Sequence, residues 1–307
     1  MMKNTIKVVK VGIAQFSPVI LNRSESVDKA CAIIAQAGQE GVKLLAFPES
    51  WLCGYPVWVD WSAFAEFDSP KAKKLYAKFY EACIEINGSE VKQISEACKK
   101  SGVCVAMGIN EIEKNSRSIY NSLIIIDERG ELQARHQKLV PTHGERLIWA
   151  PGKKGNNFKI YNSEFARIGG LICWEHWMPL ARQALHKQRE DIHIAAWPSG
   201  KEMHQIASRH YAFEGRCFTL SSCSHMTPDS FPNDFEFAAE LLLQKDRLPN
   251  GGSAVIGPDG SYITAPLFDC EKLITADIDL NRICEESLTL DVCGHSSRPD
   301  IFEFRIL

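Results

Sequence analysis

Two hydrophobic periods alternate along the chain. Short runs rich in Val, Ile, Leu and Ala recur between longer segments in which apolar residues return every three or four positions. The short runs are typical of buried strands, and the longer period is typical of amphipathic helices. We predict strands at 7–15, 44–47, 103–109, 120–127, 131–137, 166–172, 192–197, 218–222, 254–257, 262–265 and 273–278. We predict helices at 27–39, about 70–85, about 90–100, 179–189 and 202–215.

Residues at the ends of two segments support the helix predictions. Ser24 or Ser26 can cap the first helix, and Gly41 can end it. Ser89 and Gly102 stand in the corresponding places around the third predicted helix. Small polar residues before a helix and glycine after it satisfy backbone groups that the helix leaves unpaired, so these boundaries agree with the hydrophobic pattern.

Strands and helices alternate, but two pairs of strands are separated only by short turns. Residues 128–130 join one pair, and the sequence PDG at 258–260 joins the other, which indicates two hairpins. Hairpins give antiparallel neighbours, so we predict an α/β layered fold with mixed sheets. No repeat or linker divides the chain, and we expect one domain over 1–307. The irregular stretch at 226–251 is predicted to be a long surface loop or lid.

Composition and charge exclude several classes of protein. Among 307 residues, 45% are hydrophobic and the net charge is only −3, which gives no reason to expect nucleic acid or an anionic membrane as partner. No apolar run approaches the ~18 residues of a membrane span. Lys3, Lys7 and Lys10 interrupt the N-terminal apolar residues, so we expect no secretion signal.

The cysteine pattern bounds the compartment and the metal chemistry. The chain has 11 cysteines, without any CxxC pair. In a chain without an export signal, scattered cysteines are typical of free thiols, so we expect a cytoplasmic protein. A structural zinc cage usually needs paired ligands, and we expect no metal.

One cysteine stands apart, in the sequence GGLICWEHWMPLAR at 169–182. A predicted strand ends at Cys173, and Pro179 can begin the next helix. Because helix N-termini favour negative charge, we expect this junction to lower the pKa of the thiol. His176 completes a C-x-x-H spacing, which would suit half of a zinc site or a Cys–His catalytic pair, while a buried core cysteine is the simplest alternative.

Two further stretches place chemically useful residues at strand ends. FPES brings Glu49 to the end of a buried strand, and HQKLVPTHGER brings Lys138 and Glu145 past another. Side chains at strand ends converge in α/β folds. A carboxylate base, a cation and a thiol are the groups needed to attack an unsaturated carbon and stabilise the resulting charge.

Taken together, FPES, HQKLVPTHGER and GGLICWEH resemble the nitrilase superfamily of carbon–nitrogen hydrolases, over nearly the whole chain. The resemblance implies a catalytic triad of Glu49, Lys138 and Cys173. It also implies a second glutamate, structural or catalytic, at Glu145, which holds the lysine and helps with proton transfer. The sequence Cys-Trp-Glu is similar to the true nitrilase branch. The implied fold is a four-layer αββα sandwich that pairs through helices into a homodimer or higher oligomer, without metal or organic cofactor.

The resemblance also implies a reaction. We expect hydrolysis of a small-molecule nitrile to the carboxylic acid and ammonia, through a thioimidate and an acyl-enzyme on the cysteine. The alternatives are an amidase or a nitrile-hydrating enzyme that uses the same residues, and a non-catalytic scaffold with this fold. Aromatic residues cluster near the motifs, and we expect Trp51, Tyr55, Trp174 and His176 to bind the substrate.

Overall fold

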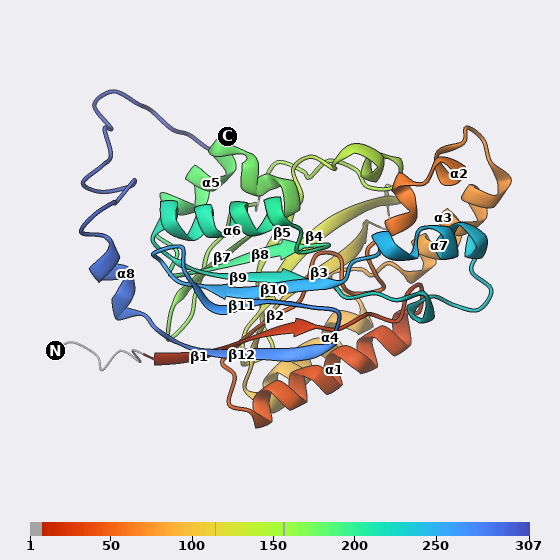
Figure 1. Ribbon diagram of the computed structural model, residues 1–307, viewed down its shortest axis with the longest axis horizontal. Coiled ribbons are helices and arrows are strands. Elements are labelled where there is room, and N and C mark those ends of the chain that lie inside the picture. Colours follow the sequence, from red (N-terminus) through yellow and green to blue (C-terminus); the bar gives the residue numbers. More distant parts are fainter. Residues whose placement is uncertain (1–7, 114, 156) are drawn as a thin grey trace.

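The computed structural model describes residues 8–113, 115–155 and 157–307. Two six-stranded sheets face each other (Figure 1). The first has the order β12-β1-β2-β3-β4-β5, and the second has the order β11-β10-β9-β8-β7-β6. In the first sheet the strands are β1 (Val8–Gln15), β2 (Leu44–Ala46), β3 (Cys104–Glu113), β4 (Ser118–Ile126), β5 (Leu132–Gln137) and β12 (Lys272–Asp279). In the second they are β6 (Tyr161–Asn162), β7 (Arg167–Ile172), β8 (Ile192–Trp197), β9 (Phe218–Cys223), β10 (Gly251–Ile256) and β11 (Tyr262–Phe268).

Both sheets are mixed, as the sequence predicts. In each sheet three central strands run parallel, namely β1, β2 and β3 in the first and β7, β8 and β9 in the second. The outer strands join antiparallel, and β4–β5 and β10–β11 are the two predicted hairpins. The carboxyl ends of the central strands therefore gather at one edge of each sheet, where side chains from distant parts of the sequence can meet.

Helices cover the outer face of each sheet (Figure 1). Helices α1 (Arg23–Gln39) and α4 (Ser89–Ser101) pack on the first sheet, and α5 (Pro179–His186) and α6 (Glu202–Gly215) lie over the second. The expected four-layer αββα arrangement is confirmed. The first helix is capped by neither predicted serine, because Asn22 Oδ1 accepts the hydrogen bond from the Glu25 amide at 3.2 Å.

Alternate side chains of a strand point into two different hydrophobic cores, one on each face of the sheet. In β2, Leu44 and Ala46 point into the core between the sheets, whereas Leu45 points into the core beneath α1 and α4. Successive strand residues face opposite sides of a sheet, so a strand covered on both faces is apolar throughout. Each fully buried Leu contributes about 1.5–3 kcal/mol to folding.

A third cluster corrects the prediction for 226–251. This segment contains α7 (Ala238–Leu243) and two short 3-10 helices at Pro228–Ser230 and Lys245–Arg247. Phe235 and Phe237 are buried against Trp58 and Phe64, so the segment packs on the protein and is not an irregular loop. The remaining helices are α2 (Ser62–Ala65), α3 (Pro70–Ala82) and α8 (Asn281–Glu286). Three further 3-10 helices lie at Val57–Asp60, His143–Leu147 and Cys173–Trp177. Within the described residues, no helix combines the length and the apolarity that a bilayer crossing requires.

Candidate active site

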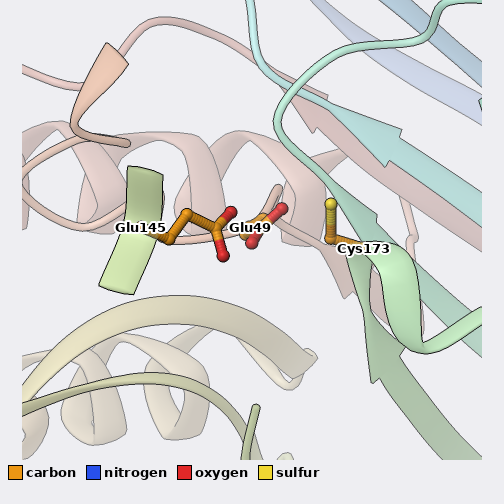
Figure 2. A group of neighbouring side chains, drawn as sticks. All are labelled: Glu49, Glu145 and Cys173. Carbon is orange, nitrogen blue, oxygen red and sulfur yellow. The ribbon is translucent and has the colours of Figure 1, made fainter. Parts of the chain in front are cut away.

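Three segments far apart in the sequence bring four polar side chains together. Glu49 follows β2, Lys138 follows β5, and Cys173 follows β7, while Glu145 lies in the 3-10 helix at His143–Leu147. The sulfur of Cys173 and one carboxylate oxygen from each glutamate lie within 4.8 Å of one another. Figure 2 shows the carboxyl group of Glu49 between that of Glu145 and the sulfur of Cys173. The convergence predicted from the strand ends is therefore present.

A single ammonium group lies between the two carboxylates. Lys138 Nζ donates to Glu49 Oε1 at 2.8 Å and to both oxygens of Glu145, at 2.9 and 2.7 Å. The lysine is only 1% exposed, and both glutamates are buried. Buried charges of this kind are costly unless they are paired and hydrogen-bonded. The three atoms of the thiol–carboxylate group also have the spacing of a metal site, but Lys138 already supplies the cation between the carboxylates.

The carboxyl group of Glu49 is suited to accept a proton near neutral pH. Burial raises its pKa to about 7, and the charge of Lys138 acts in the opposite direction. Lys138 and Asn121 both donate to Oε1, at 2.8 and 2.7 Å, which leaves Oε2 for the Cys173 thiol. For Lys138 itself, burial disfavours the charge, but the anionic neighbours outweigh burial and raise its pKa. A base with a pKa near the working pH and a permanent cation beside it are an effective pair for proton transfer.

The pKa of the Cys173 thiol differs from the value expected from the sequence. Its pKa is raised well above the ordinary value, because the residue is buried and Glu49 lies beside it; the charge of Lys138 only partly offsets both effects. The predicted lowering by a helix N-terminus fails because α5 begins only at Pro179, after a separate 3-10 helix. The resting form is therefore a neutral thiol, and it would need a base to act as a nucleophile.

The backbone at Cys173 is held in a sharp bend. Its φ is 53°, a left-handed conformation that costs an L-residue about 1–2 kcal/mol. Glu175 holds this bend: Oε2 accepts from the Ile172 amide at 2.8 Å, and Oε1 accepts from the Leu139 amide at 2.8 Å. The carboxylate of Glu175 thus ties the end of β7 to the end of β5, next to Cys173 and Lys138. In the sequence this role is visible only as a charged residue near a cysteine.

The carboxylate of Glu145 is fixed from three sides. Besides Lys138, the hydroxyl of Tyr55 donates to Oε1 at 2.9 Å, and the amide of Thr142 donates to Oε2 at 2.6 Å. Thr142 and Glu145 form a capping box, in which a side chain three residues into the helix satisfies the first backbone amide. Glu145 therefore holds Lys138 in place with all its acceptor positions engaged.

A cavity of about 840 Å³ opens above these residues. This volume is within the range of about 300–1,000 Å³ typical of small-molecule sites. Tyr55 and Trp174, which the sequence predicts to bind substrate, both line it. The sequence did not single out the other lining residues one by one, although five of them lie within the motif HQKLVPTHGER: Val57, Asp60, Val140, Pro141, Thr142, His143, Arg146, Met178, Pro198, Ser199, Lys201, His204, Arg247 and Pro249.

Trp51 and His176 are not among the described residues that line the cavity, so their predicted substrate contacts are corrected. Trp51 is fully buried in the core beneath α1, packs edge-on against Phe47, and donates from Nε1 to the Phe16 carbonyl at 2.6 Å. His176 lies behind Cys173 and stacks on Trp197. Nearness in sequence to a motif residue was misleading, because both side chains are buried outside the cavity, whereas Trp174, next to Cys173, lines it.

Comparison with known proteins agrees with this geometry. The model of the carbon-nitrogen hydrolase family matches residues 10–285. The chain is 38% identical to "Nitrilase 2" of an unknown prokaryotic organism, over 97% of this chain and 92% of that protein. It is 34% identical to an aliphatic nitrilase of Rhodococcus rhodochrous, over 97% of this chain and 79% of that protein.

A solved structure shares the fold at lower sequence identity. Saccharomyces cerevisiae Nit3, a member of branch 10 of the nitrilase superfamily, superposes with a TM-score of 0.73 and 19% identity. The match covers 96% of this chain and 99% of that one. From the extent of the family match, the identity to full-length relatives and the shared fold, the chain belongs to the carbon-nitrogen hydrolase family.

Proposed function

We propose that this protein is a nitrilase that hydrolyses an organic nitrile to the carboxylic acid and ammonia. The observation that carries the proposal is the buried Glu49–Lys138–Glu145 cluster beside the Cys173 thiol, at the base of a small-molecule cavity. Both of these relatives are nitrilases by name. Their identity to this chain supports the choice of a nitrile over an amide as the substrate.

In the proposed reaction, covalent attack comes first. Glu49 takes the thiol proton as the sulfur of Cys173 attacks the nitrile carbon, and the nitrile nitrogen receives a proton. The product of this step is a thioimidate on Cys173. Lys138 lies next to Glu49 and stabilises the negative charge that develops on nitrogen.

Two water molecules complete the reaction. The first adds to the thioimidate carbon with Glu49 as base, and the tetrahedral adduct collapses with loss of ammonia to leave a thioester. The second water attacks the thioester, and the carboxylic acid leaves as the thiol is restored. Lys138, held by Glu145, keeps its charge through both steps. Collapse with loss of the sulfur instead would release the amide.

The experiment that tests the proposal is turnover of a panel of nitriles and amides, with ammonia, acid and amide measured separately. Because Arg146, Lys201 and Arg247 line the cavity, the panel includes nitriles that carry a carboxylate. We expect the C173A variant to lose turnover by at least about a thousandfold, as for loss of a covalent nucleophile. The matched control is C98A, which removes a buried thiol beneath α4.

A mass spectrum of enzyme quenched during turnover of a slow nitrile should show an adduct on Cys173. Turnover of amides without any nitrile would overturn the proposal in favour of an amidase. Turnover of neither, with an unmodified Cys173, would favour a scaffold. The split between acid and amide products reports which group leaves the tetrahedral adduct.

We also propose that the protein is a homodimer that pairs through α5 and α6. Both helices expose large apolar side chains on the outer face of the second sheet: Leu180, Met203, Ile206 and Phe213. A cluster of exposed apolar residues on adjacent helices is typical of a protein–protein interface. A second copy of the chain is the partner that the family resemblance implies.

A further inference from the structure

A buried chain of hydrogen bonds runs from Cys173 away from the cavity. His176 Nδ1 lies 2.7 Å from the Cys173 carbonyl oxygen, and His176 Nε2 lies 3.0 Å from His193 Nε2. His193 Nδ1 lies 3.0 Å from Glu190 Oε2. All four residues are at most 3% exposed, and the reaction proposed above uses neither histidine nor Glu190.

The Cys173 carbonyl at the end of this hydrogen-bond chain determines which atom donates in each of its hydrogen bonds. The Cys173 carbonyl can only accept, so His176 carries its proton on Nδ1 and presents a bare Nε2 to His193. His193 must then donate from Nε2. The three contacts need three protons, and two neutral imidazoles supply only two of them. The third proton therefore lies between His193 Nδ1 and Glu190 Oε2.

The surroundings agree with a neutral, proton-bearing Glu190. Burial raises the pKa of Glu190 to about 7, and burial lowers the pKa values of His176 and His193 well below their ordinary range. The other oxygen, Glu190 Oε1, accepts a hydrogen bond from the Tyr211 hydroxyl. A carboxylic acid that donates through one oxygen and accepts through the other is hydrogen-bonded at both oxygens without a net charge.

Close packing holds the side chains of this hydrogen-bond chain in place in the core. A Cβ at Gly169 would lie 2.2 Å from Glu190 Oε2, so β7 requires glycine where the carboxyl group approaches. The His193 ring stacks on Tyr211 with centroids 3.6 Å apart, and the His176 ring stacks on Trp197 at 4.6 Å. These contacts leave both imidazoles little freedom to rotate.

We propose that the proton shared by Glu190 and His193 sets the direction of this chain and thereby positions Cys173, so that loss of the proton releases the Cys173 carbonyl and slows turnover. Without it, His193 donates to Glu190 and presents a bare Nε2 to the bare Nε2 of His176. The two nitrogens then repel each other until His176 moves its own proton to Nε2. His176 can no longer donate to the carbonyl, and the strained bend at Cys173 loses a support.

Other ionisable groups surround the chain without replacing its proton. His186 Nε2 donates to Glu214 at 3.2 Å, and Arg182 pairs with Glu214 at 2.6 Å. Burial disfavours the charge of Glu214, but these hydrogen bonds lower its pKa to about 2, so it stays ionised. The charged or titratable groups that face Glu190, His193 and His176 from neighbouring elements are His136, Glu175, Arg182, His186, Asp191, Tyr211, Glu214 and Cys217.

The first test needs no substrate. In protein labelled with ¹⁵N-histidine, one-bond and two-bond couplings identify which ring nitrogen carries the proton, and H176N and H193N assign the signals. At about pH 6, below the pKa of Glu190, we expect His176 protonated on Nδ1 and His193 on Nε2. Above about pH 8 we expect both signals to change together. Protonation of His176 on Nε2 at the lower pH would overturn the proposal.

The second test compares two substitutions of Glu190. In E190Q, the amide donates to His193 and its carbonyl accepts from Tyr211, which preserves the direction of the chain without a proton to lose. We expect E190Q to keep its kcat to higher pH than the wild type. E190L removes the donor, and we expect kcat to fall about tenfold, with a smaller change in KM, because Cys173 is displaced and not the substrate.

This inference rests on the proposed function, because it takes Cys173 as the nucleophile. The two tests distinguish a failure of the inference from a failure of the proposed function. Identical pH profiles for E190Q and the wild type would overturn the positioning role. An inactive wild type would refute the nitrilase proposal. The tautomers of His176 and His193 would still show whether the hydrogen bonds run in the proposed direction. Thermal unfolding of each variant establishes that it folds.

Discussion

At the scale of single residues, the site depends on how three charges share one buried volume. Glu49 and Glu145 bind the same ammonium group of Lys138, and Glu145 is fully engaged by further donors. Of the two, only Glu49 keeps an oxygen, Oε2, that no donor engages, and burial raises its pKa to about 7. The two glutamates are chemically identical, and in the proposed reaction their surroundings divide the roles between them: one holds the cation, and the other exchanges a proton.

Glu49→Gln removes the proton acceptor while keeping the size of the side chain. We expect kcat to fall about 10²- to 10⁴-fold, as for loss of a general base, with a smaller change in KM. In the wild type, kcat/KM should rise as the pH approaches about 7 from below, because only the ionised carboxylate of Glu49 can take the thiol proton, and it should fall again at higher pH as Glu190 loses its proton. Steady-state rates over a pH series measure both effects.

The control for this substitution is Glu113→Gln, which changes a half-buried carboxylate paired with Lys153 and outside the site. Its rates should match the wild type at every pH. Retention of the rise near neutral pH in the Glu49→Gln variant would show that another group is the base.

At the scale of elements, the active site is assembled where strand ends are tied together. Glu175 binds the Leu139 amide after β5 and the Ile172 amide at the end of β7. Burial acts against its charge, but His136 and the two amides lower its pKa below the ordinary value. A carboxylate with a lowered pKa in the folded state stabilises the fold above the unfolded pKa, and that stability is lost as the pH falls through the folded pKa.

Glu175→Gln should therefore affect stability and catalysis together. The amide nitrogen of glutamine cannot accept a hydrogen bond, so one backbone N–H is left unpaired in the core. We expect the free energy of unfolding near neutral pH to fall by about 1–3 kcal/mol, and kcat to fall because Cys173 and Lys138 are no longer tied together. Denaturant unfolding at neutral and acidic pH, where the difference should shrink, measures the effect.

Glu131→Gln is the matched control, since Glu131 lies in the exposed turn between β4 and β5. Unchanged stability of the Glu175→Gln variant would mean that solvent or another group replaces the lost acceptor.

The strand limits show where the hydrophobic pattern is a sufficient guide. The predictions for 192–197 and 202–215 agree with β8 and α6, which follow their apolar periods to the end. The prediction for β3 stopped at Ile109, but the strand continues to Glu113. Asn110 is buried and polar, and it is satisfied by hydrogen bonds with Ser50 and Trp149 from other segments. A pattern based on polarity treats such a residue as exposed.

At the scale of the whole molecule, exposed leucines lie on two different surfaces, and only one of these surfaces is a proposed dimer interface. Leu180 lies on α5, which is joined to α6 by the Arg182–Glu214 ion pair, whereas Leu288 stands exposed after α8. Only the first lies on one of two joined helices that both expose large apolar side chains and cover a sheet. The proposed homodimer therefore depends on Leu180 and not on Leu288.

Leu180→Glu places a charge in the proposed interface. Burial of a leucine contributes about 1.5–3 kcal/mol, so its loss should raise the dimer dissociation constant by at least about tenfold. Light scattering over a concentration series should show dimers of the wild type and of Leu288→Glu, and monomers of Leu180→Glu. A wild type that is monomeric throughout the series would contradict the dimer.

The sequence by itself determined the layered α/β class, most helices and strands, and the identity of Glu49, Lys138, Glu145 and Cys173 as a set. These features are local, since a hydrophobic period and a motif are both written in neighbouring residues. Their distances, and the sharing of one lysine by two glutamates, follow from strand ends that meet only in the folded chain.

The tertiary structure alone decided the properties that depend on neighbours distant in sequence. Burial raises the pKa of Cys173, where the local sequence indicated a lower value. The cavity includes Tyr55 and Trp174 but not Trp51 or His176, because backbone direction after each bend decides where a side chain points. Glu190 meets Tyr211 of α6, and His193 of β8 meets His176, only through tertiary packing. Electrostatic and steric environments are sums over three-dimensional neighbours, and a linear sequence does not contain those sums.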